Sequence, residues 1–101
     1  MSEKVERKVI ISPSGATLSE AECLGATPHG MQRRWSDGGI LIMDASFHKG
    51  DLHGLYRSWW KNGKLKEKGT FHHGKRVGTY SWYSEKGEIV EQREYDPEPM
   101  P

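Results

Sequence analysis

Long apolar runs, a strong net charge and paired cysteines are all missing from this chain of 101 residues. Hydrophobic residues make up 34% of it, charged residues make up 29%, and the formal net charge is only +1. No stretch approaches the roughly 18 consecutive apolar residues of a membrane-spanning helix. A nearly neutral chain also has no bulk attraction for nucleic acid or an anionic membrane, so we expect neither as a partner.

The first residues, MSEKVERKVIISPSG, are charged where a signal peptide would be apolar, which predicts a cytoplasmic protein. The single cysteine, Cys23, excludes an internal disulfide and cannot form a metal site alone. Four Trp, four Tyr and two Phe argue against disorder. The length favours one domain that spans 1–101, and the three prolines of DPEPMP predict an extended tail at 96–101.

The chain is rich in internal repetition, with a period of 24 residues. The segment GLYRSWWKNGKLKEKGTF, which begins at Gly54, aligns without a gap on GTYSWYSEKGEIVEQREY, which begins at Gly78. The recurring structural positions are Gly30, Gly39, Phe47, Gly54, Tyr56, Gly63, Leu65, Phe71, Gly78, Tyr80, Gly87, Ile89 and Tyr95. The period predicts a degenerate unit at 6–29, full units at 30–53 and 54–77, and a shortened unit at 78–95.

Each unit has the pattern of a β-hairpin. Asn62-Gly63, between segments rich in β-forming residues, predicts a type I′ turn with positive φ at both residues. The predicted register places Trp60 opposite Leu65, and it places Gly54 opposite Phe71 so that the glycine makes room for the ring. The equivalent tips are Ser14-Gly15, Gly38-Gly39 and Lys86-Gly87.

Four such hairpins predict an all-β fold, a single-layer antiparallel meander roughly 35–40 Å long at about 4.8 Å per strand. Alternation along the strands places Trp35, Trp59 and Tyr83 on one face. No segment with helical spacing remains to cover the other, aromatic face, which therefore requires curvature, a second copy of the chain or a partner. That face is predicted to contain Leu41, Phe47, Tyr56, Trp60, Leu65, Phe71, Tyr80, Trp82, Ile89 and Tyr95.

The pattern G-x-Y-x-x-W-x-x-N-G-x-L-x-x-x-x-x-F-x-x-G-x-x-x-G, from Gly54 to Gly78, resembles the MORN (membrane occupation and recognition nexus) repeat. It is most similar to the bacterial variant-2 form found in YwqK-type antitoxins. The resemblance implies a non-enzymatic sheet of hairpins that acts by binding, in some bacterial members as the immunity half of a toxin–antitoxin pair. Ile11, Cys23 and Ala26 stand where the pattern has Trp, Phe and Gly, as expected of a capping unit.

The five histidines, His29, His48, His53, His72 and His73, fall near the predicted turns between hairpins. Equivalent positions in successive hairpins lie two strands apart, roughly 10 Å, which is too far for shared zinc ligation at about 2.0–2.3 Å. We therefore predict solvent-exposed turn histidines. No motif of a hydrolase, metalloprotease, phosphate loop or dinucleotide site occurs, so we expect no catalytic residue, metal or cofactor.

Aromatic and basic residues together favour a protein-binding surface, because Trp and Tyr anchor interfaces and charge steers association. One interpretation is an antitoxin or immunity protein that occludes a partner toxin. The alternatives are a scaffold that self-associates as a homodimer through its aromatic face and a peripheral lipid-binding module. The purely structural alternative is that the aromatic residues only stabilise the sheet and that the neighbouring basic and acidic hairpins screen each other's charge. The candidate partner-binding residues are Trp35, Trp59, Trp60, Tyr83, Arg57, Lys66, Lys68 and Arg76.

Overall fold

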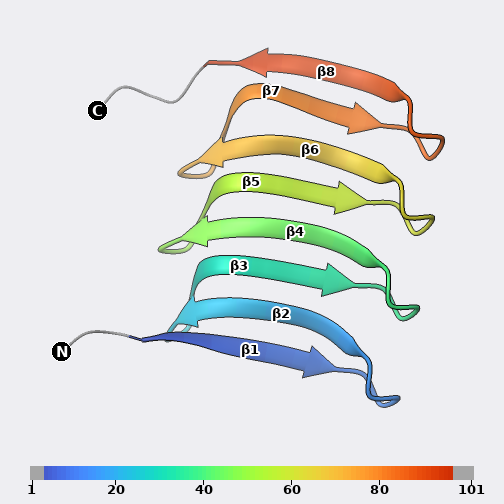
Figure 1. Cartoon of the computed structure of the whole chain (residues 1–101). Helices are drawn as coiled ribbons and strands as arrows, with labels where there is room; N and C mark the ends of the chain where they lie inside the picture. Colours follow the sequence, from blue (N-terminus) through green and yellow to red (C-terminus); the bar gives the residue numbers. More distant parts are fainter. Residues whose placement is uncertain (1–3, 97–101) are drawn as a thin grey trace.

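The computed structural model describes residues 4–96 and confirms an all-β fold of eight antiparallel strands in one sheet. The strands follow one another in chain order across the sheet (Figure 1). The predicted tail, 96–101, lies outside the described residues except for Asp96. The strands are β1 (Val5–Ile11), β2 (Thr17–Leu24), β3 (Thr27–Trp35), β4 (Leu41–His48), β5 (Asp51–Trp59), β6 (Leu65–His72), β7 (Lys75–Tyr83) and β8 (Ile89–Tyr95).

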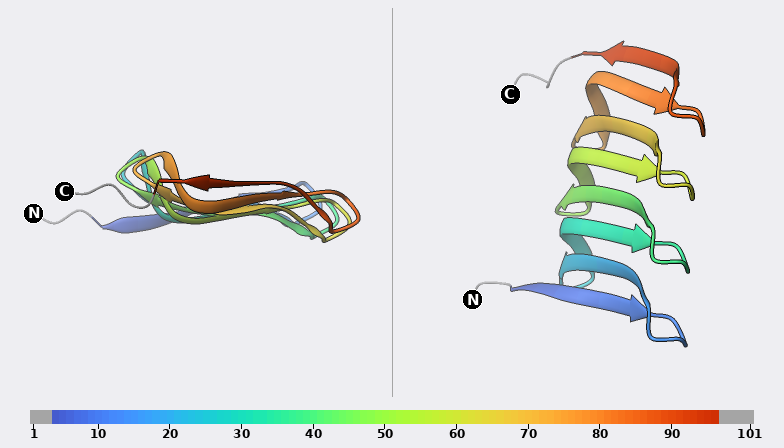
Figure 2. Two further views of the ribbon diagram at one scale, coloured as in Figure 1. Left: turned by 90° about the horizontal axis from the view of Figure 1, so that it is seen from above. Right: turned by 45° about the vertical axis from the view of Figure 1, so that its right-hand side comes forward.

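The sheet is a single layer. Its Cα extents are 41 × 39 × 11 Å, and the view from above shows the strands lying in one thin, curved layer (Figure 2). Hairpin tips line one end of the strands and the turns between hairpins line the other (Figure 1). Within residues 4–96 no helix forms that is long and apolar enough to cross a membrane.

The hairpin tips differ from the predicted type I′ turns. Trp60 N–H donates to the Lys64 carbonyl at 2.8 Å, Gly63 N–H donates to the Trp60 carbonyl at 2.9 Å, and only Gly63 has positive φ, at 86°. These bonds define a three-residue loop in which a type I turn is followed by a left-handed glycine. The other three tips, at Ser12–Ala16, Ser36–Ile40 and Ser84–Glu88, repeat both hydrogen bonds.

This tip geometry changes the register at its end of the strands. Gly54 pairs with Phe71 as predicted, but a bulge between Ser58 and Trp59 places Trp59 opposite Leu65. The predicted pairing of Trp60 with Leu65 is therefore wrong, since Trp60 leaves the strand and enters the tip. The type I′ geometry occurs instead between hairpins, where Lys49-Gly50 and His73-Gly74 have φ values of 48° and 95°, and 47° and 85°.

The role predicted for Gly54 is also wrong. Gly54 has φ +113°, and a Cβ added there would lie 3.1 Å from the Cβ of Ser46 on β4, so Gly54 is required at a backbone kink. A glycine covered by a ring occurs at Gly69, where an added Cβ would lie 2.0 Å from Cδ2 of Tyr80. The aromatic cover that stabilises a strand glycine is therefore provided by Tyr80, from β7.

The core combines the buried Cys23 on β2 and Ala45 on β4 with an aromatic cluster on β5 to β8. Tyr80 is fully buried and Phe71 is 9% exposed, with their ring centroids 5.7 Å apart. Burial is the main cause of a raised pKa of Tyr80. The hydrogen bond that the Tyr80 hydroxyl donates to Glu67 Oε1, at 2.6 Å, raises this pKa further, so the phenol stays protonated. Tyr56, Trp82 and Tyr95 complete the cluster through ring contacts. Ile89, predicted to lie on the aromatic face, is 55% exposed at the edge strand.

We predict that Gly69→Ala destabilises the fold, because the new methyl group would overlap the ring of Tyr80. Overpacking of this kind lowers the free energy of unfolding by about 1–3 kcal/mol. Urea denaturation midpoints of the wild-type and variant proteins measure the loss. Thr70→Ala, at the exposed neighbouring position, is the matched control and should change stability by less than about 0.5 kcal/mol. Equal stability of the two variants would contradict the packing of Tyr80 over Gly69.

Candidate functional site

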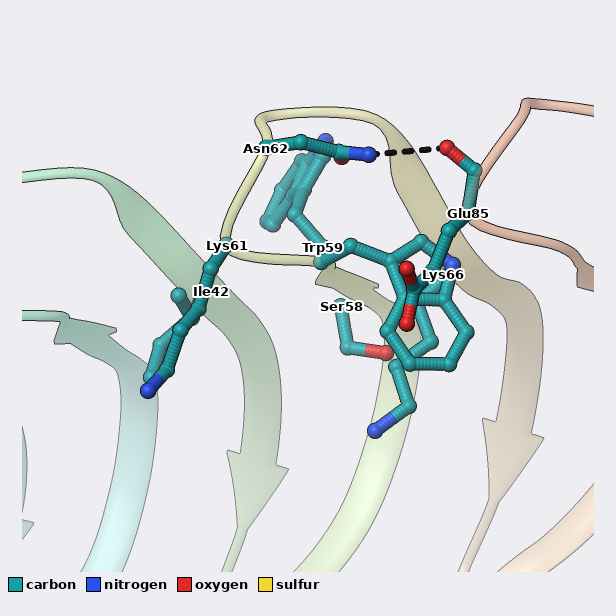
Figure 3. Close-up of a pocket in the computed structure, with 8 residues that line it drawn as sticks. Ile42, Ser58, Trp59, Lys61, Asn62, Lys66 and Glu85 are labelled. Atoms are coloured by element: carbon teal, nitrogen blue, oxygen red, sulfur yellow. Dashed lines mark hydrogen bonds between the residues drawn. The ribbon is translucent and has the colours of Figure 1, made fainter.

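A groove of about 610 Å³ lies where β5 meets its hairpin tip (Figure 3). Two consecutive tryptophans, Trp59 and Trp60, contribute both of their indole rings to it. Trp59 ends β5 and Trp60 begins the tip, so the alternation of side chains between faces stops here and both rings reach one groove. The remaining lining residues are Ile42, Ser58, Lys61, Asn62, Lys66 and Glu85.

The groove is held in place by hydrogen bonds from this tip to the tip of the next hairpin. Trp60 Nε1–H donates to the Tyr83 carbonyl at 3.2 Å, and Asn62 Nδ2–H donates to the Glu85 carbonyl at 2.8 Å, which Figure 3 shows as a dashed line. Asn62 Oδ1 also accepts the Lys64 N–H at 2.9 Å within its own turn. These bonds fix the orientation of the Trp60 ring, so one wall of the groove is preorganised.

Cations lie beside both indoles. Lys66 Nζ is 4.8 Å from the ring centroid of Trp60, and Arg57 Cζ is 5.2 Å from that of Trp59. Both distances are within the range of a cation–π interaction. The groove therefore combines apolar ring surface with positive charge, and Glu85 is its one acidic lining residue.

A buried carboxylate positions Arg57. Asp44 is 6% exposed and accepts a hydrogen bond from Arg57 Nη2 at 2.7 Å, while Arg33 Nε lies 3.7 Å from its other oxygen. Asp44 Oδ1 and Arg57 Nε have no hydrogen-bond partner among the described residues. Because a buried carboxylate is stable when it is paired with a cation, Asp44 holds Arg57 close to the Trp59 ring.

The other predicted site residues are only partly brought together. Trp35 lines a neighbouring hollow with Lys61 and Ile42, and Tyr83 lines another with Lys68. Arg76 does not join them, because its guanidinium lies 4.7 Å from the ring of Tyr80 in the aromatic cluster. Ile42, Asn62, Glu85 and Asp44 also contribute to this surface and were not among the predicted site residues. The alignment of Asn62 with the next tip, 24 residues on, is the signal that could have identified its link between units.

The histidines form a contiguous row at the opposite end of the strands, a set of contacts that the comparison of equivalent positions did not predict. Ring centroids are 4.8 Å apart for His29 and His48, 5.7 Å for His48 and His53, and 4.5 Å for His53 and His73. Equivalent histidines are indeed separated, but the two sets alternate on adjacent strands. In the described residues 4–96, no group of three or more His, Cys, Asp or Glu residues could hold a metal ion.

Comparison with known proteins identifies the repeat. Residues 52–73 and 76–96 match the MORN repeat variant, one copy covering most of β5 and β6 and the next covering β7 and β8. No curated protein and no solved structure matches the chain. Trp59 and Trp60 thus lie in the first matched repeat, and the hydrogen bonds of Trp60 and Asn62 cross to the second.

We predict that Trp60→Phe lowers stability by about 0.5–1.5 kcal/mol, because the ring remains but its hydrogen bond to the Tyr83 carbonyl is lost. Thermal denaturation followed by circular dichroism measures the effect. Trp59→Phe is the matched control, since it retains an aromatic face for Arg57 and should cause a smaller loss. A loss in Trp59→Phe as large as that in Trp60→Phe would contradict the structural role assigned to the Trp60 bond.

Proposed function

We propose that this chain is a non-enzymatic, cytoplasmic protein-binding module, and in its most specific form a bacterial antitoxin or immunity protein that covers a partner toxin. The observation that carries the proposal is the Trp59–Trp60 groove, in which two consecutive tryptophans line one hollow and a cation lies beside each indole ring. Tryptophan and arginine are the residues that most often dominate binding energy at interfaces. The MORN repeat variant at 52–73 and 76–96 supports a repeat-type binding module.

The chemistry of the groove indicates the kind of segment it takes. A side chain that is apolar or aromatic would fit in the groove beside the tryptophans, and carboxylates next to it would meet Lys61 and Lys66. We therefore propose that the partner presents an acidic segment with an apolar anchor. Neutralisation would result from steric occlusion, with the anchor setting affinity and the charges setting association rate.

The first experiment is to purify the tagged chain gently from its host and identify the proteins that copurify. An antitoxin requires one stoichiometric partner that stops growth when expressed alone and is harmless when this chain is coexpressed. A partner without toxicity would keep the binding function and reject the antitoxin. If the chain elutes only with copies of itself, both the antitoxin and the foreign partner are rejected, and the self-associating scaffold is supported.

We predict that Trp59→Ala weakens partner binding by about 30-fold or more, the effect expected when an interface hot spot worth about 2 kcal/mol is lost. Isothermal titration calorimetry on the purified complex measures the dissociation constant. The melting temperature of the free variant is measured in parallel. Loss of stability without loss of affinity would place Trp59 in the scaffold and reject the groove as the binding site.

We predict that Lys66→Glu slows association and reduces its dependence on salt, because the positive charge beside Trp60 is replaced by a negative one. Stopped-flow association rates at two ionic strengths measure the change. Lys75→Glu introduces the same change of charge at the opposite end of the strands and is the matched control. Equal slowing by the two substitutions would mean that net charge, and not the groove, steers the partner.

A further inference from the structure

The turn between β4 and β5 is held against the preceding hairpin by two hydrogen bonds. Gly50 N–H donates to the Pro28 carbonyl at 2.8 Å, and Lys49 N–H donates to Nδ1 of His29 at 3.0 Å. Lys49 has φ 48°, a backbone conformation that a residue with a side chain adopts only at a cost. The two bonds therefore hold a turn that is strained locally.

The same arrangement recurs 24 residues later, between β6 and β7. Gly74 N–H donates to the Leu52 carbonyl at 2.8 Å, and His73 N–H donates to Nδ1 of His53 at 3.1 Å. His73 also has positive φ, at 47°. Two independent units thus use a histidine nitrogen in the same way, which makes the contact a property of the repeat.

We propose that His29 and His53 are proton-sensitive clasps, which hold the inter-hairpin turns when neutral and release them when protonated. An imidazole accepts a hydrogen bond at Nδ1 only as the neutral tautomer with its proton on Nε2. Protonation converts Nδ1 into a donor, which then faces the N–H of Lys49 or His73, another donor. The protonated form of each histidine therefore cannot accept this backbone hydrogen bond.

The clasps belong to a wider group of titratable side chains. His48 lies between the clasps, with its ring 4.8 Å from His29 and 5.7 Å from His53. Desolvation by packing lowers the pKa of His48, and the charges of His29, Lys49, His53 and His73 lower it further. The charged and titratable groups nearest the clasps are Glu22 on β2, His48 and Lys49 at the end of β4, Asp51 on β5, His72 and His73 at the end of β6, and Lys75 on β7.

One ion-pair contact lies beside the second clasp. Asp51 Oδ2 lies 3.7 Å from Nδ1 of His73. Both side chains are more than half exposed, so this pair contributes little.

The direction of the pH dependence follows from the two hydrogen bonds to Nδ1. Because the folded chain makes these bonds only with neutral imidazoles, the unfolded chain binds more protons and stability rises with pH. The stabilisation is complete above the unfolded histidine pKa of about 6.5 and declines as the pH falls below it. The tip end of the sheet, with Trp60 and Asn62, has no histidine and should keep its contacts.

The chain contains an internal control. The third inter-hairpin turn, Gly25-Ala26, joins β2 to β3, and the position equivalent to His29 is Val5 there. Its backbone amides should not respond to histidine titration. The amide of Gly63, which donates to the Trp60 carbonyl at the tip, is a second control.

The test is a ¹⁵N–¹H NMR titration of the full chain from pH 7.5 to 5.5, with the imidazole signals followed in the same samples. We expect the Lys49 amide to shift with the midpoint of His29 titration and its corrected hydrogen-exchange protection to fall at least tenfold. The amides of Gly25, the position equivalent to Lys49, and of Gly63 should stay unchanged. A Lys49 amide that is unaffected while His29 titrates would overturn the proposal, and this needs no variant.

The variant His29→Asn, His53→Asn separates the clasp from general acid effects. Asn Oδ1 can accept the same backbone N–H but does not titrate. We expect the wild-type melting temperature to fall by about 4–8 °C between pH 7.5 and 5.5, and the variant to show less than half of that fall. The same fall in both proteins would assign the pH dependence to other groups and reject the clasps.

Discussion

The absence of a second layer is the constraint on which the rest of this structure depends. At 11 Å thick, the sheet cannot bury both of its faces, so each hairpin must be stabilised mainly by the hairpins beside it. Contacts between elements accordingly concentrate between strands that are neighbours in the chain. Three chemically different contacts provide this stabilisation between strands. They are the packing of Tyr80 over Gly69, the hydrogen bond from Trp60 to the Tyr83 carbonyl and the hydrogen bond from Lys49 N–H to His29.

At the two ends of the strands, different chemical groups link neighbouring hairpins. At the tips, uncharged donors of Trp60 and Asn62 reach backbone carbonyls of the next hairpin, and these bonds do not depend on pH near neutrality. At the other end, imidazole nitrogens accept backbone N–H groups. The proposed binding groove lies at the tips, so the surface offered to a partner is built on the end of the sheet that has no histidine.

The sequence was sufficient to predict the strand order and the pairing of Gly54 with Phe71, because a 24-residue period with alternating residues leaves few ways to pair strands. It was insufficient for the turns. Asn62-Gly63 is compatible with both a type I′ turn and a type I turn followed by a left-handed glycine, and the bonds of Trp60 decide between them.

The predicted site was incomplete for a related reason. Arg76 reaches the aromatic face because an irregularity between Lys68 and Thr70 shifts the register of β6 against β7. The row of histidines was missed because comparing equivalent positions in successive units overlooks contacts between different positions on adjacent strands. Asp44 could have been recognised only from the pairing that sets it opposite Arg33 on one side and Arg57 on the other.

The location of the two chain ends has a mechanical consequence. Residues near both ends lie on the same side of the sheet, at its first and last strands, and the line between them crosses the strands at a steep angle (Figure 1). A force applied along this line would load the backbone hydrogen bonds of an edge strand one after another, as in a zipper, and not all at once in shear. Mechanically, the sheet would therefore peel from its edges, strand by strand, at low force, however stable each hairpin is against heat.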